Sequence, residues 1–387
     1  MLVKKVLIVG GGIGGLTAAT AFARRGIAVE VVEIKPAHAV HGVGIIQPGN
    51  ALRALRSLDL LDPCLEAGFQ VDDYVYFDAV GSELARIRMK RIADEALPAV
   101  NFLPRPTLHR ILEQSALRHG ATIRMGVSVR DFVDDGEKVD VKFSDGTVGT
   151  YDIVVGADGI RSALRERLFG TAFEPRYTGH AVWRVTLPRP RDLNFQGIHY
   201  GRGAKAGLVP LSAESMYLLL VTNEPAETWF ERSELVTALK DRLAQFTCSW
   251  ISPLREQLDA QSEVVYVKIE EVTLPAPWHS GRVVLLGDAA HASSPHIAQG
   301  ATMAIEDACV LAEEAAHADS VPAMFERYMK RRYARCKFVQ DYSRKIGEQG
   351  QLDEPAACQA RNDRIRAEFA HGSTDGRPHE ALLAEPI

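Results

Sequence analysis

Three short runs of small and acidic residues could do chemistry, because each follows an apolar strand directly. The runs are GGGIGG at residues 10–15, GADG at residues 156–159 and GDAAH at residues 287–291, and the strands before them are residues 6–9, 153–155 and 283–286. Glycines in such turns let a phosphate approach backbone N–H groups closely. Together the runs predict a chain that returns to one dinucleotide from three places.

The first run has the residues and spacing of a dinucleotide fingerprint. Gly10, Gly12 and Gly15 fit G-x-G-x-x-G, with Gly14 in the same turn, and an apolar helix pattern follows. The helix N-terminus favours a pyrophosphate, because its dipole and its free N–H groups face the ligand. The next strand ends in Glu33, at about the 20-residue spacing at which an acidic residue accepts both ribose hydroxyls. With no arginine just after it, Glu33 favours an unphosphorylated ribose and argues against NADP in this site.

From residue 1 to about residue 345 the chain resembles the single-component FAD-dependent monooxygenases that hydroxylate aromatic rings. This is the family of 4-hydroxybenzoate, salicylate and 6-hydroxynicotinate hydroxylases. The likeness rests on the first run, on GADGIRS at residues 156–162 and on GD at residues 287–288 with the AQG that follows at residues 298–300. Beyond the first run, the residues that match the family's motifs are Arg105, Asp158, Gly159, Gly287, Asp288, Pro295 and Gly300. Many members have glycine where Ala298 stands, a departure that concerns the shape of this loop.

The resemblance implies a role for these residues. The Asp158–Gly159 pair and Arg105 lie near the FAD pyrophosphate, and Asp288 binds the ribityl chain. Gly300 opens a helix whose N-terminus, with a charge of roughly +0.5, faces the pyrimidine edge of the flavin ring. Pro295 lies beside the place where oxygen reacts. The implied enzyme uses NADH or NADPH and O2 to hydroxylate a small aromatic or heteroaromatic substrate through a C4a-hydroperoxyflavin.

Two residues are candidates for catalysis. His296 adjoins the proline of the third motif, and a neutral imidazole there could accept the proton of a substrate hydroxyl. The alternative is a histidine that hydrogen-bonds a loop carbonyl. Tyr217 belongs to the predicted substrate sheet together with His199 and Tyr200, and each of the three is a candidate proton relay or, more simply, a wall or core residue. The Trp183–Arg184 pair resembles one common in the family and is interpreted as packing.

A metal site is the alternative use of the third motif. Asp288, His291 and His296 have metal-ligand side chains, but the two histidines do not have the i, i+4 spacing that places both on one helix face. The resemblance already assigns Asp288 to FAD. We therefore expect no metal.

The coarse pattern predicts an α/β fold: a Rossmann-like, glutathione-reductase-like FAD-binding domain interrupted by a β-sheet-rich substrate domain, with C-terminal helices. The FAD-binding domain takes residues 1–72, 101–175 and 273–345, and the substrate domain takes residues 73–100 and 176–272. Strand patterns mark the latter, and the apolar residues 215–221 suggest a sheet covered on both sides. Residues 346–387 form a polar C-terminal tail, which leaves open a covering helix, a dimer contact or partial disorder.

Composition excludes several classes of partner. The 387 residues have a net charge of −5 and no basic block, so no nucleic acid is expected. No apolar stretch reaches the roughly 18 residues that a membrane span needs. Five cysteines without C-x-x-C spacing indicate a reduced, cytoplasmic protein. A homodimer is left open.

Other functions on the same scaffold remain as alternatives. A flavin dehydrogenase, reductase or halogenase would share these glycines, although the W-x-W-x-I-P motif of flavin halogenases is absent. A non-catalytic FAD-binding redox sensor is a further alternative. Because the chain has no second G-x-G-x-x-G with its own strand and acid, we expect NADH or NADPH to bind only transiently, between the two lobes. The segment around His296 is similar to that of 6-hydroxynicotinate hydroxylases, which favours a small aromatic or heteroaromatic acid as substrate.

Overall fold

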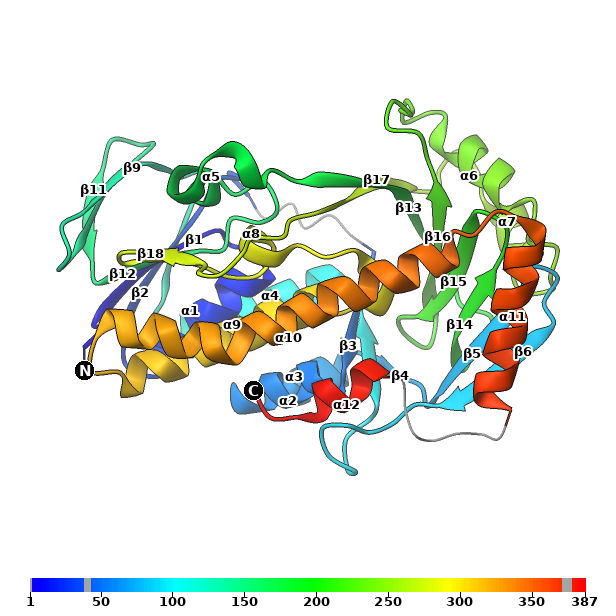
Figure 1. Cartoon of the computed structure of the whole chain (residues 1–387), viewed down its shortest axis with the longest axis horizontal. Coiled ribbons are helices and arrows are strands. Elements are labelled where there is room, and N and C mark those ends of the chain that lie inside the picture. Colours follow the sequence, from blue (N-terminus) through cyan, green and yellow to red (C-terminus); the bar gives the residue numbers. More distant parts are fainter. Residues whose placement is uncertain (1, 38–42, 371–377) are drawn as a thin grey trace.

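The computed structural model of the chain describes residues 2–37, 43–370 and 378–387. The predicted ranges 1–72 and 346–387 therefore fall partly outside the described residues. Within these residues the strands form four sheets. A six-stranded sheet and a seven-stranded sheet lie toward opposite ends of the molecule, and the long helix α10 (Val321–Gly350) extends from one toward the other (Figure 1).

The six-stranded sheet brings the three glycine-containing runs together. Its strand order is β18 (His279–Ser280), β19 (Val283–Leu285), β12 (Ile153–Gly156), β1 (Lys5–Val9), β2 (Ala28–Glu33) and β8 (Thr122–Met125). All neighbours are parallel except β18 and β19. Val9 is in register with Gly156, and Gly156 with Leu285, so all three runs leave the same edge of the sheet.

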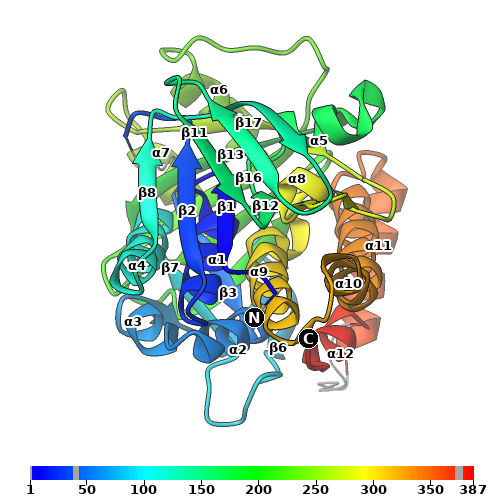
Figure 2. The same cartoon turned by 90° about the vertical axis from the view of Figure 1, so that its left-hand side faces the viewer.

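Helices cover this sheet. Helix α1 (Ile13–Ala23), which begins within the first run, contacts both α4 (Arg105–Arg118) and α9 (Gly300–His317), and Figure 2 shows α4 and α9 on either side of it. Nearly every residue of α1 is buried, because its alanines and glycines let neighbouring helices approach closely. The predicted α/β fold with an FAD-binding arrangement of strand, glycine turn and helix is confirmed.

The fold also contains two three-stranded sheets and several short helices. One sheet has the order β11 (Val148–Tyr151), β10 (Val139–Phe143) and β9 (Val129–Asp134), and the other β3 (Ile45–Pro48), β7 (Val100–Leu103) and β4 (Phe69–Gln70). The short helices are α2 (Gly49–Ser57), α3 (Leu61–Glu66), α5 (Ala163–Phe169), η1 (Thr171–Phe173), α8 (Asp288–His291) and η2 (Pro295–Ile297).

The seven-stranded sheet is covered on both faces, as the apolar residues 215–221 predict. Its order is β17 (Val265–Glu271), β13 (Arg176–Pro188), β16 (Ser215–Asn223), β15 (Ala204–Pro210), β14 (Phe195–Tyr200), β5 (Asp73–Asp78) and β6 (Glu83–Arg88). One face packs its apolar side chains, such as Trp183, on α6 (Leu235–Leu243) and α7 (Ser252–Gln257). The other face lines a cavity. The division of the chain into domains at residues 73–100 and 176–272 stays a prediction.

The tail contains two helices rather than irregular chain in its described part. Helix α10 continues to Gly350, and α11 (Pro355–Phe369) and α12 (Pro378–Ala384) follow. Helix α11 packs on β6 and places Phe369 against Tyr76, with ring centroids 5.7 Å apart. None of the described helices is long and apolar enough to cross a membrane. The five cysteines are all buried and unpaired.

Candidate active site

One cavity of about 700 Å³ joins the glycine runs to the seven-stranded sheet. Of the residues predicted from the sequence, those that line it are Gly12, Gly14, Arg105, Gly159, Tyr217, Gly287, Asp288, Pro295, His296 and Gly300. The others, Gly10, Gly15, Glu33 and Asp158, are absent from its lining. The cavity therefore has two parts: one made by strand ends and helix N-termini, and one made by a sheet face.

The glycines of the first run have different structural tasks. A Cβ on Gly10, whose φ is +111°, would stand 2.3 Å from the carbonyl oxygen of Ala157, and a Cβ on Gly15 would stand 1.9 Å from that of Gly10. These two glycines let the turn pack tightly. A Cβ on Gly12 would meet nothing within 4 Å, so the space above this residue is open toward the cavity. No side chain caps the N-terminus of α1, which leaves its N–H groups to a ligand such as a phosphate.

Glu33 ends β2 with its carboxylate held beside this turn. Oε2 accepts a hydrogen bond from Gly11 N at 2.8 Å, and Oε1 accepts one from Lys35 N at 3.0 Å. Each carboxylate oxygen has a second lone pair, so Glu33 can still accept hydrogen bonds from a ribose. The geometry fits the predicted role, although the residue is not part of the cavity lining.

Two aspartates at the strand ends have capacity for a ligand. Asp158 accepts a hydrogen bond from Leu164 N through Oδ2 at 3.1 Å, while its buried Oδ1 has no partner. The side chain of Asp288 is accessible from the cavity but lies deep among protein atoms, and this burial raises its pKa. An acceptor so placed is stabilised when hydroxyl groups hydrogen-bond to it. The orphaned oxygen, the open space at Gly12 and the two carboxylates fit an FAD pyrophosphate and ribityl chain.

The loop after Asp288 contains Ala298, the residue at which this chain departs from the family's third motif. Ala298 has a φ of +56°, in the left-handed region that favours glycine, so glycine in other members suits this conformation better. Next to it, Gln299 exchanges hydrogen bonds with Asn50, at 3.1 and 3.3 Å. This exchange fixes the residue before Gly300, which opens α9 at the cavity wall. The shape that the family's glycine favours is thus retained with alanine.

His296 lies in the cavity with one unused ring nitrogen. Its Nδ1 is buried without a hydrogen-bond partner, and its ring packs so closely on α10 that a Cβ on Gly347 would stand 2.4 Å from Nε2. Burial, and then the charges of Lys205 and His180, hold its pKa well below the usual value, so the imidazole is neutral. The alternative of a bond from Nδ1 to a loop carbonyl is not what the structure shows.

The register of the sheet separates the other candidates. Tyr217 and Tyr200 lie on the cavity face, and burial raises the pKa of Tyr217 to about 12, so its phenol stays protonated. His199 is absent from the cavity lining and stacks on Phe77, with ring centroids 4.6 Å apart. Its role is therefore packing, the simpler of the two interpretations.

Three cavity residues were missed or misread from the sequence. Arg184, interpreted as packing, lines the cavity, and burial lowers its pKa. Lys205 and Arg361 line it as well, from β15 and α11. The signal for Lys205 was an isolated charge inside the apolar segment AKAGLVP. No sequence motif marks Arg361, because α11 belongs to the polar tail.

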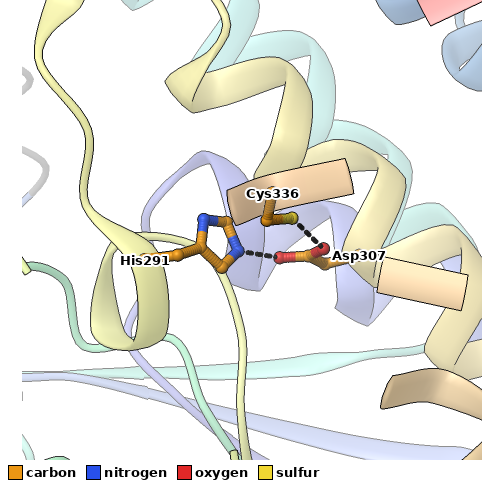
Figure 3. A group of neighbouring side chains, drawn as sticks. All are labelled: His291, Asp307 and Cys336. Atoms are coloured by element: carbon orange, nitrogen blue, oxygen red, sulfur yellow. Dashed lines mark hydrogen bonds and ion pairs between the residues drawn. The ribbon is translucent and has the colours of Figure 1, made fainter. Parts of the chain in front are cut away.

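A buried ion-pair network stands behind the third run. His291 Nε2 lies 2.6 Å from Asp307 Oδ2, which also accepts a hydrogen bond from Gly287 N at 2.9 Å, and Cys336 lies beside them (Figure 3). Arg332 donates to Asp307 Oδ1 at 2.7 Å. Burial alone would raise the pKa of Asp307, but His291 and Arg332 outweigh it and hold the pKa well below its usual value. The three ligand-type side chains lie close enough for a metal ion, but the guanidinium already neutralises the carboxylate. We interpret the network as one that fixes the Gly287 turn.

Comparison with known proteins agrees with this arrangement. Residues 4–343 match the family model described as "FAD binding domain". The chain is 35% identical to the putative FAD-dependent monooxygenase YetM of Bacillus subtilis, covering 92% of this chain and 96% of YetM. It is 31% identical to 6-hydroxynicotinate 3-monooxygenase of Bordetella bronchiseptica, over 88% of this chain and 90% of that protein.

A solved structure shares the fold over its whole length. A variant of HpxO from Klebsiella pneumoniae, in complex with FAD, is similar with a TM-score of 0.87 at 25% identity, covering 99% of both chains. The family match, the relatives and the cavity built from three glycine runs lead to one assignment. The chain belongs to the FAD-binding family of FAD-dependent monooxygenases that hydroxylate aromatic substrates.

Proposed function

We propose that the chain hydroxylates a small aromatic or heteroaromatic ring that binds against the cavity face of the seven-stranded sheet. The observation that supports this most is the continuity of the cavity, which joins the residues that fit FAD to a wall carrying Tyr217, Tyr200 and His296. A ring in this space would lie beside the flavin site and away from bulk water. When bound, FAD supplies the redox chemistry, accepting hydride from NADH or NADPH and activating O2.

The chain's own residues hold and orient the cofactor in this proposal. The open space at Gly12 and the side chain of Arg105 receive the pyrophosphate, Glu33 the ribose, and Asp288 the ribityl chain. The N-terminus of α9, which begins at Gly300, places partial positive charge beside the flavin ring and stabilises negative charge there.

Proton handling falls to the substrate wall. We infer that the neutral imidazole of His296, which lines the cavity, accepts a hydrogen bond from a substrate hydroxyl and so raises the electron density of the ring. Tyr217, protonated at neutral pH, donates a hydrogen bond to a ring oxygen or stacks beside the ring. These roles are independent, so each can be removed by substitution without the other.

The test is a screen of the FAD-loaded protein with hydroxybenzoates, hydroxypyridines and hydroxyquinolines. For each compound, consumption of NADH and NADPH is measured together with the hydrogen peroxide released. We expect at least one ring compound to raise consumption strongly and to be hydroxylated, with little peroxide. Rapid flavin reduction at full rate without any ring compound, or oxidation of a substrate without hydroxylation, would favour a dehydrogenase or reductase instead.

A further inference from the structure

Strand β15 presents one charged side chain to the cavity. Its residues Ala204 and Ala206 pack into the core on the helix-covered face, and strand side chains alternate, so Lys205 lies on the opposite face. There it lines the cavity, although only 4% of its surface is exposed. A buried ammonium is costly unless an anion or several acceptors lie beside it.

The surroundings of Lys205 offer no such partner. Its stem lies beneath the end of α10, where a Cβ on Gly350 would stand 2.7 Å from Cδ and 3.3 Å from Nζ. Among the described residues, none forms a hydrogen bond or ion pair with Nζ, and the charges that act on it include no carboxylate. Carboxylates of Asp288, Glu368 and Glu380 also line the cavity, but the groups that interact electrostatically with Lys205 are Arg361 of α11, His296 of η2 and His180 of β13. Each of these is cationic or neutral.

Arg361 strengthens the positive character of this corner. It is 3% exposed, its guanidinium lies 4.6 Å from the ring centroid of Tyr200, and it donates to the carbonyl oxygen of Gly201 at 3.2 Å. The oxygens that accept hydrogen bonds from its guanidinium are neutral. Burial, and then the charge of Arg361, lower the pKa of Lys205 to about 7. The described residues therefore place two neighbouring buried basic groups together without a neutralising anion.

We propose that the ring substrate carries an ionised oxygen, either a carboxylate or a ring oxygen, and that Lys205 binds it, with Arg361 adding positive charge. This inference rests on the proposed function and names its substrate class as anionic. If the substrate arrives as a neutral hydroxyl compound and Lys205 as the free amine, the proton passes from that oxygen to Nζ. The O–H bond breaks, an N–H bond forms, and the net charge is unchanged.

The ion pair would also orient the ring. His296 of η2 lines the same cavity, so an anion fixed at Lys205 determines which other ring substituent meets its imidazole. An oxygen ionised on the ring itself would make the ring a better nucleophile. Lys205 would then determine both which substrates bind and which ring position faces the flavin.

Two pairs of probes with matched shape test the proposal by calorimetric titration of the FAD-loaded protein. The affinities of benzoate and benzamide are compared to test whether the site binds a carboxylate. The affinities of pentafluorophenolate and pentafluorobenzene are compared to test whether it binds an ionised ring oxygen. In wild type we expect at least one anion to bind about 10- to 100-fold more tightly than its neutral partner, the usual weight of a charged hydrogen bond. Lys205→Met should abolish this preference and Lys205→Arg should retain much of it.

The control is Lys345→Met, which removes an exposed lysine that also lines the cavity and should leave the preference unchanged. The proposal is overturned if neither anion exceeds its neutral partner in wild type. It is equally overturned if the preference survives in Lys205→Met, and its loss in Arg184→Met would then assign the anion to Arg184. FAD content and thermal unfolding of each variant verify that it folds.

Failure of this inference can be told apart from failure of the proposed function. If ring hydroxylation is found but neutral rings bind as well as anions, only the role of Lys205 is wrong. If anions bind at Lys205 but no ring compound is hydroxylated, the proposed function is wrong and the anion site stands.

Discussion

Replacing Gly12 with alanine separates cofactor binding from folding. Gly12 has φ −80° and ψ −173°, which alanine adopts without strain, and the new methyl group would meet no atom of the chain within 4 Å. Because alanine has less freedom in the unfolded chain, the apoprotein should become more stable by about 0.4 to 1 kcal/mol. The methyl group would stand in the space that the pyrophosphate needs. Loss of one charged hydrogen bond there, about 1.5 to 3 kcal/mol, weakens FAD binding about 10- to 100-fold.

The assay pairs thermal unfolding of the apoprotein with fluorescence titration of FAD. Gly15→Ala is the matched control from the same turn, because its Cβ would stand 1.9 Å from the carbonyl oxygen of Gly10. That variant should lose stability, whereas Gly12→Ala should fold normally and bind FAD weakly. Unchanged FAD affinity in Gly12→Ala would refute the assignment of this space to the pyrophosphate.

Four further predictions follow from the site. Asp288→Ala should fold but lose FAD affinity by about 1 to 3 kcal/mol, measured by the same titration, since hydroxyl groups would lack their acceptor; full FAD content after purification would contradict it. His296→Asn should keep FAD content and flavin reduction but release more peroxide per NADH or NADPH consumed, with partial recovery at higher pH where the substrate ionises unaided; coupling equal to wild type at every pH would return His296 to a structural role. Lys205 has a folded pKa of about 7 against 10.5 in the unfolded chain, so the destabilisation that its burial causes is fully present below pH 7 and is lost as the pH rises from 7 to 10.5. Urea unfolding should show wild type gaining stability over that range relative to Lys205→Met, and parallel curves would contradict the burial of this amine. Asp307→Asn should cost about 3 to 5 kcal/mol of unfolding free energy, because His291 would lose its buried anion and Arg332 would keep only Glu306, and an unchanged urea midpoint would argue against the network.

The part of the cavity that fits FAD was recognisable in the sequence because its residues lie in contiguous motifs. Gly10 directly follows the apolar strand β1 and Glu33 ends the apolar strand β2, and parallel strands bring their ends together by themselves. The strain at Ala298 was also detectable as a departure from glycine. In such segments, the same few residues determine both the backbone conformation of the turn and its ability to bind a ligand.

The substrate half could not be predicted as well, because it depends on sheet register and on a distant helix. Tyr217 and Tyr200 share the cavity face while His199 does not, a distinction that one residue of register would reverse. Lys205 is on that face only because β15 pairs between β14 and β16. Arg361 comes from a tail without a motif, which packs where it does because of apolar contacts such as Phe369 on Tyr76.

The fate of molecular oxygen tests the central claim most directly. The FAD-loaded protein is given NADH or NADPH, the most stimulating ring compound and oxygen-18 gas, and the product is analysed by mass spectrometry. Hydroxylation by an FAD-dependent monooxygenase predicts one labelled oxygen atom per product molecule and no label when only the water is enriched. Product that carries its new oxygen from water, or oxidised product with no new oxygen, would contradict it.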